Sequence, residues 1–148
     1  MKVVLDEGAK MPTKAHATDA GWDLYAKEDF VVPPTEVYGL EGIWAQVGSA
    51  KHDTGVHIEI PEGYVGFIKS KSGLNVKKGI TAEGVIDCGY TGSIIVKLYN
   101  HTSCKHEFKK GDKITQLVIL PINMDSLELV DSLEETDRGN NGFGSSGK

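Results

Sequence analysis

Short segments in which apolar and polar residues alternate recur along the chain, and β-branched residues are frequent in them. Alternation places every second side chain on one face of an extended strand, which favours β-strands with one buried face. Six segments fit this pattern: KVVL (2–5), DFVVPP (29–34), GVHIEIP (55–61), YVGFIKS (64–70), GSIIVKLYN (92–100) and KITQLVILPI (113–122). Evidence for helices is poor. The pattern predicts an all-β fold, as a sandwich, a barrel or a jelly roll.

Turn-forming residues separate these segments. The turn candidates are PEG (61–63), SGL (72–74), DCGYTG (87–92) and KKGDK (109–113). Residues 38–55 have no clear period and are interpreted as a long loop or an extended hairpin. From Glu134 onward the one large apolar residue is Phe143, so this part has no core of its own to join. We expect a β domain over 1–133 and a flexible Gly/Ser-rich arm over 134–148.

Composition narrows the possible partners and the location. At 148 residues the chain fits one domain with a single core. A net charge of −5 argues against broad binding to nucleic acid or an anionic membrane, because both require clustered positive charge. Cys88 and Cys104 are too few for a disulfide framework, and we find no apolar run near about 18 residues and no targeting segment. We expect the cytoplasm, or the host cytoplasm for a viral source.

The terminal segment RGNNGFGSSG (138–147) has the composition of a phosphate-binding lid. Glycine-rich backbone can curl around phosphate oxygens, Ser145 and Ser146 add hydroxyl donors, and Arg138 offers a bidentate fork. Phe143 could stack on a flat base. Taken alone, the segment fits a solvated flexible tail equally well.

Two further segments offer polar groups beside strands. In KSKSGLNV (69–76), backbone amides at Ser72 and Gly73 and the Lys71 ammonium could hold a phosphate, although an ordinary turn is the alternative. In EGVIDCGYTGSIIVKLYN (83–100), Asp87 could accept a proton from water and Tyr90 could form a wall under a sugar. The alternative is that Asp87 only shapes the turn and that Tyr90 packs in the core or at an edge.

Metal and nucleophile sites are not indicated. The five histidines show no zinc-type spacing with the two cysteines, and the GxSxG elbow of serine hydrolases is absent. If a divalent ion takes part, phosphates are expected to supply most of its ligands, as is usual for magnesium.

In order and spacing, five segments resemble the motifs of the trimeric dUTP pyrophosphatases (dUTPases). They are HATDAGWDLYA (16–26), KSKSGL (69–74), GVIDCGYTG (84–92), GDKITQLVI (111–119) and RGNNGFGSSG (138–147). The resemblance covers nearly the whole chain. It implies a small β jelly roll or distorted barrel, and a homotrimer with shared active sites in which the C-terminal arm of one subunit closes the site of a neighbour.

The resemblance also implies roles for single residues. Asp87 would activate the water that attacks the α-phosphorus of dUTP, and Tyr90 would lie under the deoxyribose and exclude a 2′-hydroxyl. The uracil edge would be read by the backbone of the 81–86 segment, and Phe143 would stack on the base. The other substrate-binding residues implied are Lys71, Ser72, Gly73, Thr81, Gly84, Val85, Ile86, Gln116, Arg138, Gly144, Ser145 and Ser146.

The implied reaction yields dUMP and pyrophosphate, which limits uracil incorporation into DNA and supplies dUMP for thymidylate synthesis. Mg²⁺ would be held mainly by substrate phosphates and water, with no direct protein ligand. Asp23 would be a structural acid near the polyphosphate end, or would act on the ion through another group.

Departures from the family pattern raise alternatives. Lys71 stands where arginine is usual, which replaces a planar fork by a point charge. The 38–55 stretch is extended and either lengthens a hairpin or serves a partner. A related dCTP deaminase would need a glutamate where this chain has Lys97, so deamination is disfavoured. A non-catalytic or regulatory dUTP-binding protein of the same fold is the remaining alternative.

Overall fold

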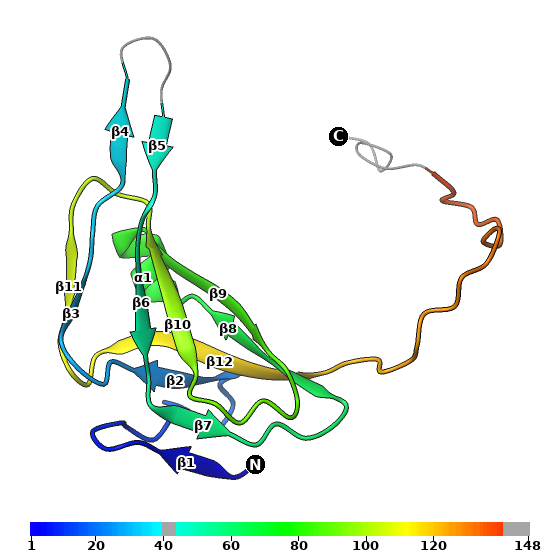
Figure 1. Cartoon of the computed structure of the whole chain (residues 1–148), viewed down its shortest axis with the longest axis horizontal. Coiled ribbons are helices and arrows are strands. Elements are labelled where there is room, and N and C mark those ends of the chain that lie inside the picture. The colour runs from blue at the N-terminus through cyan, green and yellow to red at the C-terminus, as the bar shows by residue number, and fades with distance from the viewer. Residues whose placement is uncertain (40–43, 141–148) are drawn as a thin grey trace.

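An antiparallel sheet of six strands forms the body of the described chain, which comprises residues 1–39 and 44–140 of the computed structural model. The strand order is β2 (Gly21–Tyr25), β12 (Lys113–Pro121), β8 (Tyr64–Lys69), β9 (Ile80–Ile86), β10 (Ile95–Asn100) and β6 (Gly48–Asp53). The sheet curls into a half-barrel (Figure 1). The predicted all-β, jelly-roll class is confirmed.

Two-stranded antiparallel ribbons flank this sheet. They pair β1 (Val3–Leu5) with β7 (Val56–Ile58), β3 (Phe30–Val32) with β11 (His106–Phe108), and β4 (Glu36–Tyr38) with β5 (Trp44–Gln46). The β4–β5 ribbon projects from the body (Figure 1). Of the two interpretations of residues 38–55, the extended hairpin is therefore correct. The chain then continues into β6 at the edge of the main sheet.

The predicted turn at SGL is instead the start of a helix, α1 (Ser72–Lys78). Sequence periodicity could not reveal α1, because it has seven residues and none of them is buried. It ends at Gly79, whose φ of 61° is in the left-handed region, and the Gly79 N–H donates to Asn75 O at 3.0 Å. In the part of the chain that is described, no helix is long and apolar enough to span a membrane.

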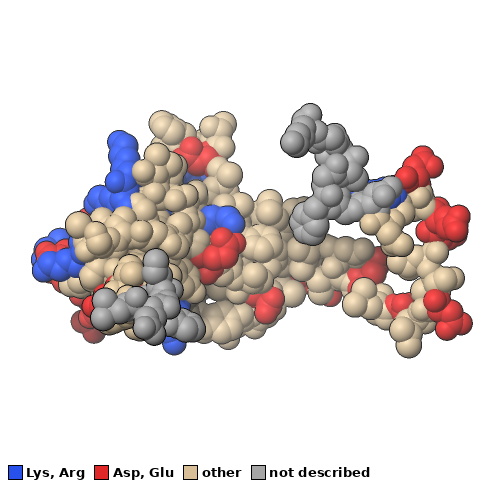
Figure 2. Space-filling model, turned by 90° about the horizontal axis from the view of Figure 1, so that it is seen from above, with Lys and Arg blue, Asp and Glu red and all other residues tan. Residues whose placement is uncertain are grey.

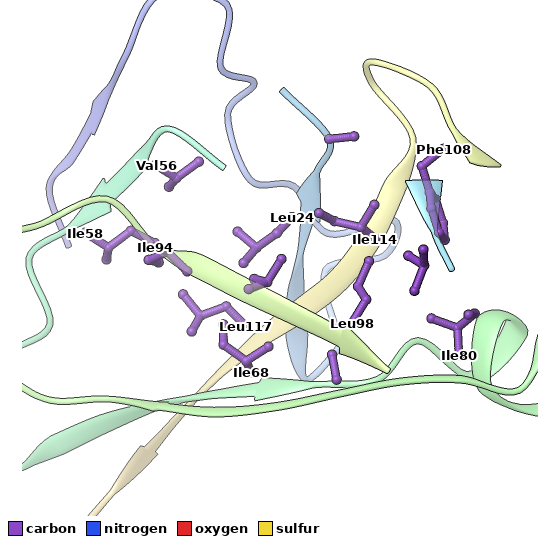
Figure 3. Close-up of a cluster of buried hydrophobic side chains, with 14 of the residues drawn as sticks. Leu24, Val56, Ile58, Ile68, Ile80, Ile94, Leu98, Phe108, Ile114 and Leu117 are labelled. Atoms are coloured by element: carbon purple, nitrogen blue, oxygen red, sulfur yellow. The ribbon is translucent and has the colours of Figure 1, made fainter. Parts of the chain in front are cut away.

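The core lies inside the curl of the sheet. Alternate residues of β10 are buried, and its Leu98 belongs to the same buried cluster as Ile68 of β8 and Leu117 of β12 (Figure 3). Leu24 of β2 completes this layer and is fully buried. Close packing of this kind fixes the register of the strands, so residues at the strand ends are held in defined positions.

Beyond β12 the chain leaves the body as an extended segment (Figure 1). Every residue from 122 to 140 is exposed, including Leu127 and Leu129. Acidic side chains are spread along this segment (Figure 2), and they are Asp125, Glu128, Asp131, Glu134, Glu135 and Asp137.

Candidate active site

Neighbouring strands bring the first group of candidate residues together. Gln116 on β12 lies opposite Asp23 on β2 and opposite Lys69 on β8. Lys71 follows β8 closely, and α1 begins immediately after it. We call this group the Asp23 cluster; it consists of Asp23, Lys71, Ser72, Gly73, Lys113 and Gln116.

Asp23 supplies a buried negative charge at the centre of this cluster, with only 6% of the residue exposed. Its carboxylate accepts hydrogen bonds from the ammonium groups of Lys71 and Lys113, the latter at 2.7 Å. Burial by itself raises the pKa of Asp23, but the hydrogen bonds and charges of the two lysines together hold this pKa below its usual value. The bond to Asp23 also raises the pKa of Lys113. Two ammonium groups on one carboxylate leave a net positive charge, which suits phosphate oxygens.

The start of α1 adds backbone donors to the cluster. The Asn75 N–H donates to Lys71 O at 2.9 Å, so the preceding N–H groups of the helix have no partner within it. Ser72 and Gly73 are exposed, and a Cβ on Gly73 would meet no atom within 4 Å. A ligand can therefore approach the backbone closely at this point.

Gln116 fixes the chain where β8 ends. Its Nε2 donates to Ser70 O at 3.0 Å, while Ser70 Oγ accepts a hydrogen bond from the Ala82 N–H at 2.9 Å. The Gln116 side chain thus holds the loop that leads into α1. Gln116 therefore helps to position Lys71. Its side-chain amide is also a polar group that could contact a ligand.

The second group of candidates lies in the turn after β9, residues 87–93, which we call the Asp87 turn. The Asp87 side chain is exposed, and no described residue donates a hydrogen bond to its carboxylate. The Tyr90 N–H donates to Asp87 O at 3.3 Å, and the Tyr90 hydroxyl donates to Ser93 O at 3.0 Å. The Tyr90 ring lies over Gly92, where a Cβ would come within 2.5 Å of the hydroxyl oxygen. Asp87 therefore presents an available base beside a ring that is 45% exposed.

The candidates on β9 span the space between the two groups. Gly84 lies opposite Ile68, and Val85 is exposed opposite Phe67. Ile86 is the last residue of the strand, directly before Asp87. Thr81 lies at the other end of β9, where its Oγ1 is 2.7 Å from Nε2 of His101. Thr81 is thus the β9 candidate most distant from the Asp87 turn.

The Asp23 cluster and the Asp87 turn are far apart within one chain. The β8–β9 register pairs Gly66 with Ile86 and Lys69 with Glu83. Asp87 therefore lies level with Val65, and Lys71 is six residues further along the chain. At the rise of a β-strand this gives a separation of about 20 Å. One chain by itself does not join the two groups in one pocket.

Comparison with known proteins agrees with the motif order. Residues 7–147 match the family model described as dUTPase. The chain belongs to the dUTPase family. Deoxyuridine 5'-triphosphate nucleotidohydrolase of Saccharomyces cerevisiae is 41% identical over 141 residues, covering 94% of this chain and 88% of the relative. The Clostridium tetani protein of the same name is 40% identical, covering 98% of this chain and 94% of the relative.

Solved dUTPase structures have the same fold. The dUTPase of Staphylococcus bacteriophage 80alpha with dUpNHpp gives a TM-score of 0.79 at 33% identity, covering 99% of this chain and 98% of that chain. A point mutant of the dUTPase from phage phi11 of S. aureus, described with a structural Mg(II) ion, gives a TM-score of 0.76 at 30% identity, covering 90% of this chain and 98% of that chain.

The remaining family candidates lie in the C-terminal arm. Arg138 is exposed in the extended segment. Phe143, Gly144, Ser145 and Ser146 lie outside the described residues.

Two parts of the site were missed from the sequence. Lys113, which binds Asp23, was not among the candidates; it directly follows a Gly-Asp turn, and no local signal distinguishes it. His57 was dismissed with the other histidines, yet its Nδ1 lies 2.8 Å from Thr91 O in the Asp87 turn. A metal centre made of side chains is not formed in the part of the chain that the structure describes, where no three His, Cys, Asp or Glu residues are suitably grouped.

Proposed function

We propose that this chain hydrolyses dUTP to dUMP and pyrophosphate, and so limits uracil incorporation into DNA and supplies dUMP for thymidylate synthesis. Membership of the dUTPase family carries the proposal, together with the names of its relatives in yeast and Clostridium tetani. The cytoplasm is the proposed location, and the free thiols of Cys88 and Cys104 suit a reducing compartment.

The active site is proposed to form between copies of the chain in a homotrimer. The separation of about 20 Å between the Asp87 turn and the Asp23 cluster supports this, because a second copy can place its Asp23 cluster beside the first copy's Asp87 turn. Exposed apolar side chains such as Val85, Ile95 and Leu120 offer surface for burial between copies. The exposed leucines of 122–140 suit an arm that lies on a neighbouring subunit.

Asp87 is proposed as the catalytic base. Its carboxylate accepts a proton from the attacking water, whose oxygen forms a bond to the α-phosphorus. The bond from that phosphorus to the bridging α–β oxygen breaks, and pyrophosphate leaves. The exposed carboxylate without a described hydrogen-bond partner supports this role, since nothing in the described chain competes for its oxygens.

The triphosphate is proposed to lie on the Asp23 cluster, held by Lys71, Ser72, Gly73 and Gln116. Arg138, Gly144, Ser145 and Ser146 would contact its γ-phosphate end from the arm. Both Asp23 oxygens already accept from lysines, so Asp23 suits a supporting role better than that of a direct metal ligand. Mg²⁺ is therefore proposed to be held mainly by the phosphates and water, where it neutralises charge on the phosphate oxygens.

Specificity is proposed to come from β9 and Tyr90. Thr81, Gly84, Val85 and Ile86 would read the uracil edge, chiefly through their backbone. Tyr90 would exclude the 2′-hydroxyl of a ribose, and Phe143 would stack on the base. Lys97, whose ammonium lies 4.9 Å from the centroid of the Tyr99 ring, cannot serve as the glutamate base that deamination requires.

Pyrophosphate release with Mg²⁺ tests the proposal across dUTP, UTP, dTTP and dCTP. We expect turnover of dUTP alone, and a loss of about a hundredfold or more in kcat for Asp87→Asn. The nearby Asp53→Asn variant is unsuitable as a control because Asp53 binds Ser93 of the same turn. Asp29→Asn, at an exposed ion pair that belongs to neither group, is the control and should retain most of the turnover. Equal rates on UTP and dUTP would contradict the role of Tyr90, and dUTP binding without pyrophosphate release would contradict the proposed reaction.

A further inference from the structure

His57 on β7 connects two segments that are distant in the sequence. Its Nδ1 lies 2.8 Å from Thr91 O, and its Nε2 lies 3.2 Å from Oδ1 of Asp6. Thr91 directly follows Tyr90 in the Asp87 turn, and Asp6 directly follows β1. The imidazole ring therefore joins the candidate catalytic turn to the N-terminal strand ribbon.

Both partners of His57 are hydrogen-bond acceptors. A carbonyl oxygen and an ionised carboxylate have no proton to donate, so a neutral imidazole with one N–H satisfies only one of them. An imidazolium satisfies both. The hydrogen bond to Thr91 O, and the hydrogen bond and charge of Asp6, raise the pKa of His57 although burial opposes them. The geometry thus favours the doubly protonated ring.

A second contact holds the same turn. Ser93 Oγ donates to Oδ1 of Asp53, and the same oxygen accepts from the Gly55 N–H at 2.9 Å. The Tyr90 hydroxyl in turn donates to Ser93 O at 3.0 Å. The turn is therefore fixed at Ser93 to the end of β6 and at Thr91 to β7, on the two sides of Gly92. Loss of the His57 contact would leave the Thr91 side, which is nearer to Asp87, without its anchor.

We propose that His57, held by Asp6, is a positioning residue that sets the orientation of the Asp87 turn for dUTP hydrolysis. The inference rests on the proposed catalytic role of Asp87. His57 acts through the Thr91 carbonyl and not on the substrate. Because a misplacement of about 1 Å near a reacting group can cost on the order of a hundredfold in rate, a single anchoring bond has a measurable effect on kcat.

Several charged groups surround the ring and influence its titration. The other oxygen of Asp6, Oδ2, binds the Lys27 ammonium at 3.3 Å, so Lys27 offsets part of the Asp6 charge. The remaining groups near His57 are Asp53 on β6, Lys2 before β1 and Glu59 after β7. Lys2 and Glu59 pair with each other at 3.0 Å, so they largely cancel. Asp6 is left as the dominant charge facing the ring.

Two amide variants separate the two contacts of His57. The asparagine amide nitrogen takes about the place of the histidine Nδ1, so His57→Asn can still donate to Thr91 O. The glutamine amide nitrogen takes about the place of Nε2, so His57→Gln can donate to Asp6 but not to Thr91 O. We expect His57→Gln to lose about tenfold in kcat and His57→Asn about threefold or less, each with KM within about twofold of wild type. His106→Gln, at a histidine bonded to Thr102 away from both groups, is the control and should match wild type.

The pH dependence gives an independent readout. Since the folded-state pKa of His57 is raised, the doubly bonded ring is present below that pKa and is lost as the pH rises through it. The neutral wild-type ring, like asparagine, can hold Thr91 O but not Asp6. The ratio of kcat for wild type to kcat for His57→Asn should therefore fall toward one as the pH rises above the ordinary histidine range.

Asp6→Asn tests the same point without altering the histidine. It removes the facing charge, so the midpoint of the kcat transition should move to lower pH. A kcat of His57→Gln equal to wild type, or a ratio that does not change with pH, would overturn the proposal. If the wild type released no pyrophosphate from dUTP, the proposed function would fail instead. The positioning role would then be judged by amide NMR shifts of residues 88–93, which His57→Gln should change and His57→Asn should leave close to wild type.

Discussion

Gly21 on β2 lies diagonally across from Gln116 on β12, and so closely that a Cβ on Gly21 would lie 2.8 Å from Oε1 of Gln116. It would also lie 3.2 Å from Cβ of Gln116 and from Cγ2 of Val118. Among these atoms, the Gln116 amide lies at the end of a flexible side chain. It would therefore shift more readily than the other two to accommodate the added methyl group. That amide donates a hydrogen bond to Ser70 O. A shift of the amide would therefore change the position of the loop that carries Lys71.

Gly21→Ala should therefore act on substrate binding as well as on folding. We expect the free energy of unfolding to fall by about 1–3 kcal/mol through overpacking. The KM for dUTP should rise about threefold to tenfold, because the loss of one hydrogen bond is worth about 1 kcal/mol. A double-mutant cycle with Gln116→Ala checks the cause. If Gly21→Ala costs as much in the Gln116→Ala background as in the wild type, the contact is not the reason.

Asp23→Asn keeps the shape of the buried side chain and removes its charge. The ammonium groups of Lys71 and Lys113 would then face each other without a counter-ion, and we expect unfolding to become easier by about 2 kcal/mol at neutral pH. Urea unfolding measures this change. Asp29→Asn is the comparison variant, since the Asp29–Lys109 pair is exposed and its loss should cost much less than the loss of the buried Asp23 charge.

The same carboxylate predicts a pH dependence of stability. The folded-state pKa of Asp23 lies below its value of 3.8 in an unfolded chain. Its contribution is therefore fully present above about pH 4 and is lost as the pH falls through the folded-state pKa. The stability difference between wild type and Asp23→Asn should stay constant from pH 7 to about pH 5 and shrink below about pH 4. A difference that grows on acidification would contradict this assignment.

Lys71→Arg introduces the arginine that the resemblance to the dUTPases implies at this position. A guanidinium can bond Asp23 and a phosphate at once, whereas the lysine ammonium divides three donors between them. We expect KM for dUTP to fall by about twofold to fivefold with little change in kcat, because one additional hydrogen bond contributes a net stabilisation of about 0.5–1 kcal/mol. Lys69→Arg, at the exposed pair with Glu83, serves as the control. An unchanged KM would mean that Lys113 already supplies what arginine would add.

Deletion of residues 134–148 tests the arm separately from the β domain. The described residues of the arm contribute nothing to the core, so the thermal midpoint should change by no more than a few degrees. Turnover of dUTP should fall by about a hundredfold or more, because the γ-phosphate contacts and closure of the site would be lost. Calorimetry and sedimentation check folding and assembly. Failure of the shortened chain to fold would show that the arm is structural.

Strands with regular alternation were predictable from the sequence, and those without it were not. In β10 every second residue is buried, and the apolar Val96 and Leu98 lie on that buried face. In β2, four of the five residues are buried, Asp23 among them, so no alternation marks it. In β6 the sequence GSAKHD has few strand-forming residues, and pairing with β10 determines its conformation.

The site was predictable where a motif carried it. The family resemblance proposed Asp23, Lys71 and Gln116 as candidates from three separate motifs, and these three residues lie beside one another in the structure. Contacts between residues distant in the sequence were not predictable, since Lys113 and His57 acquire their partners only through folding. The separation of the candidate residues into the Asp23 cluster and the Asp87 turn could likewise not be predicted from the sequence, because it depends on the β8–β9 register.

The distance between Asp87 and Lys71 within a chain has a genetic consequence. If each pocket combines the Asp87 turn of one copy with the Asp23 cluster of another, two chains with different defects can repair each other in a mixed assembly. In such a mixed assembly, some pockets contain both defective groups, whereas other pockets combine the two intact groups. Co-expressed inactive alleles of this protein would then complement, as alleles of an enzyme with a self-contained site cannot.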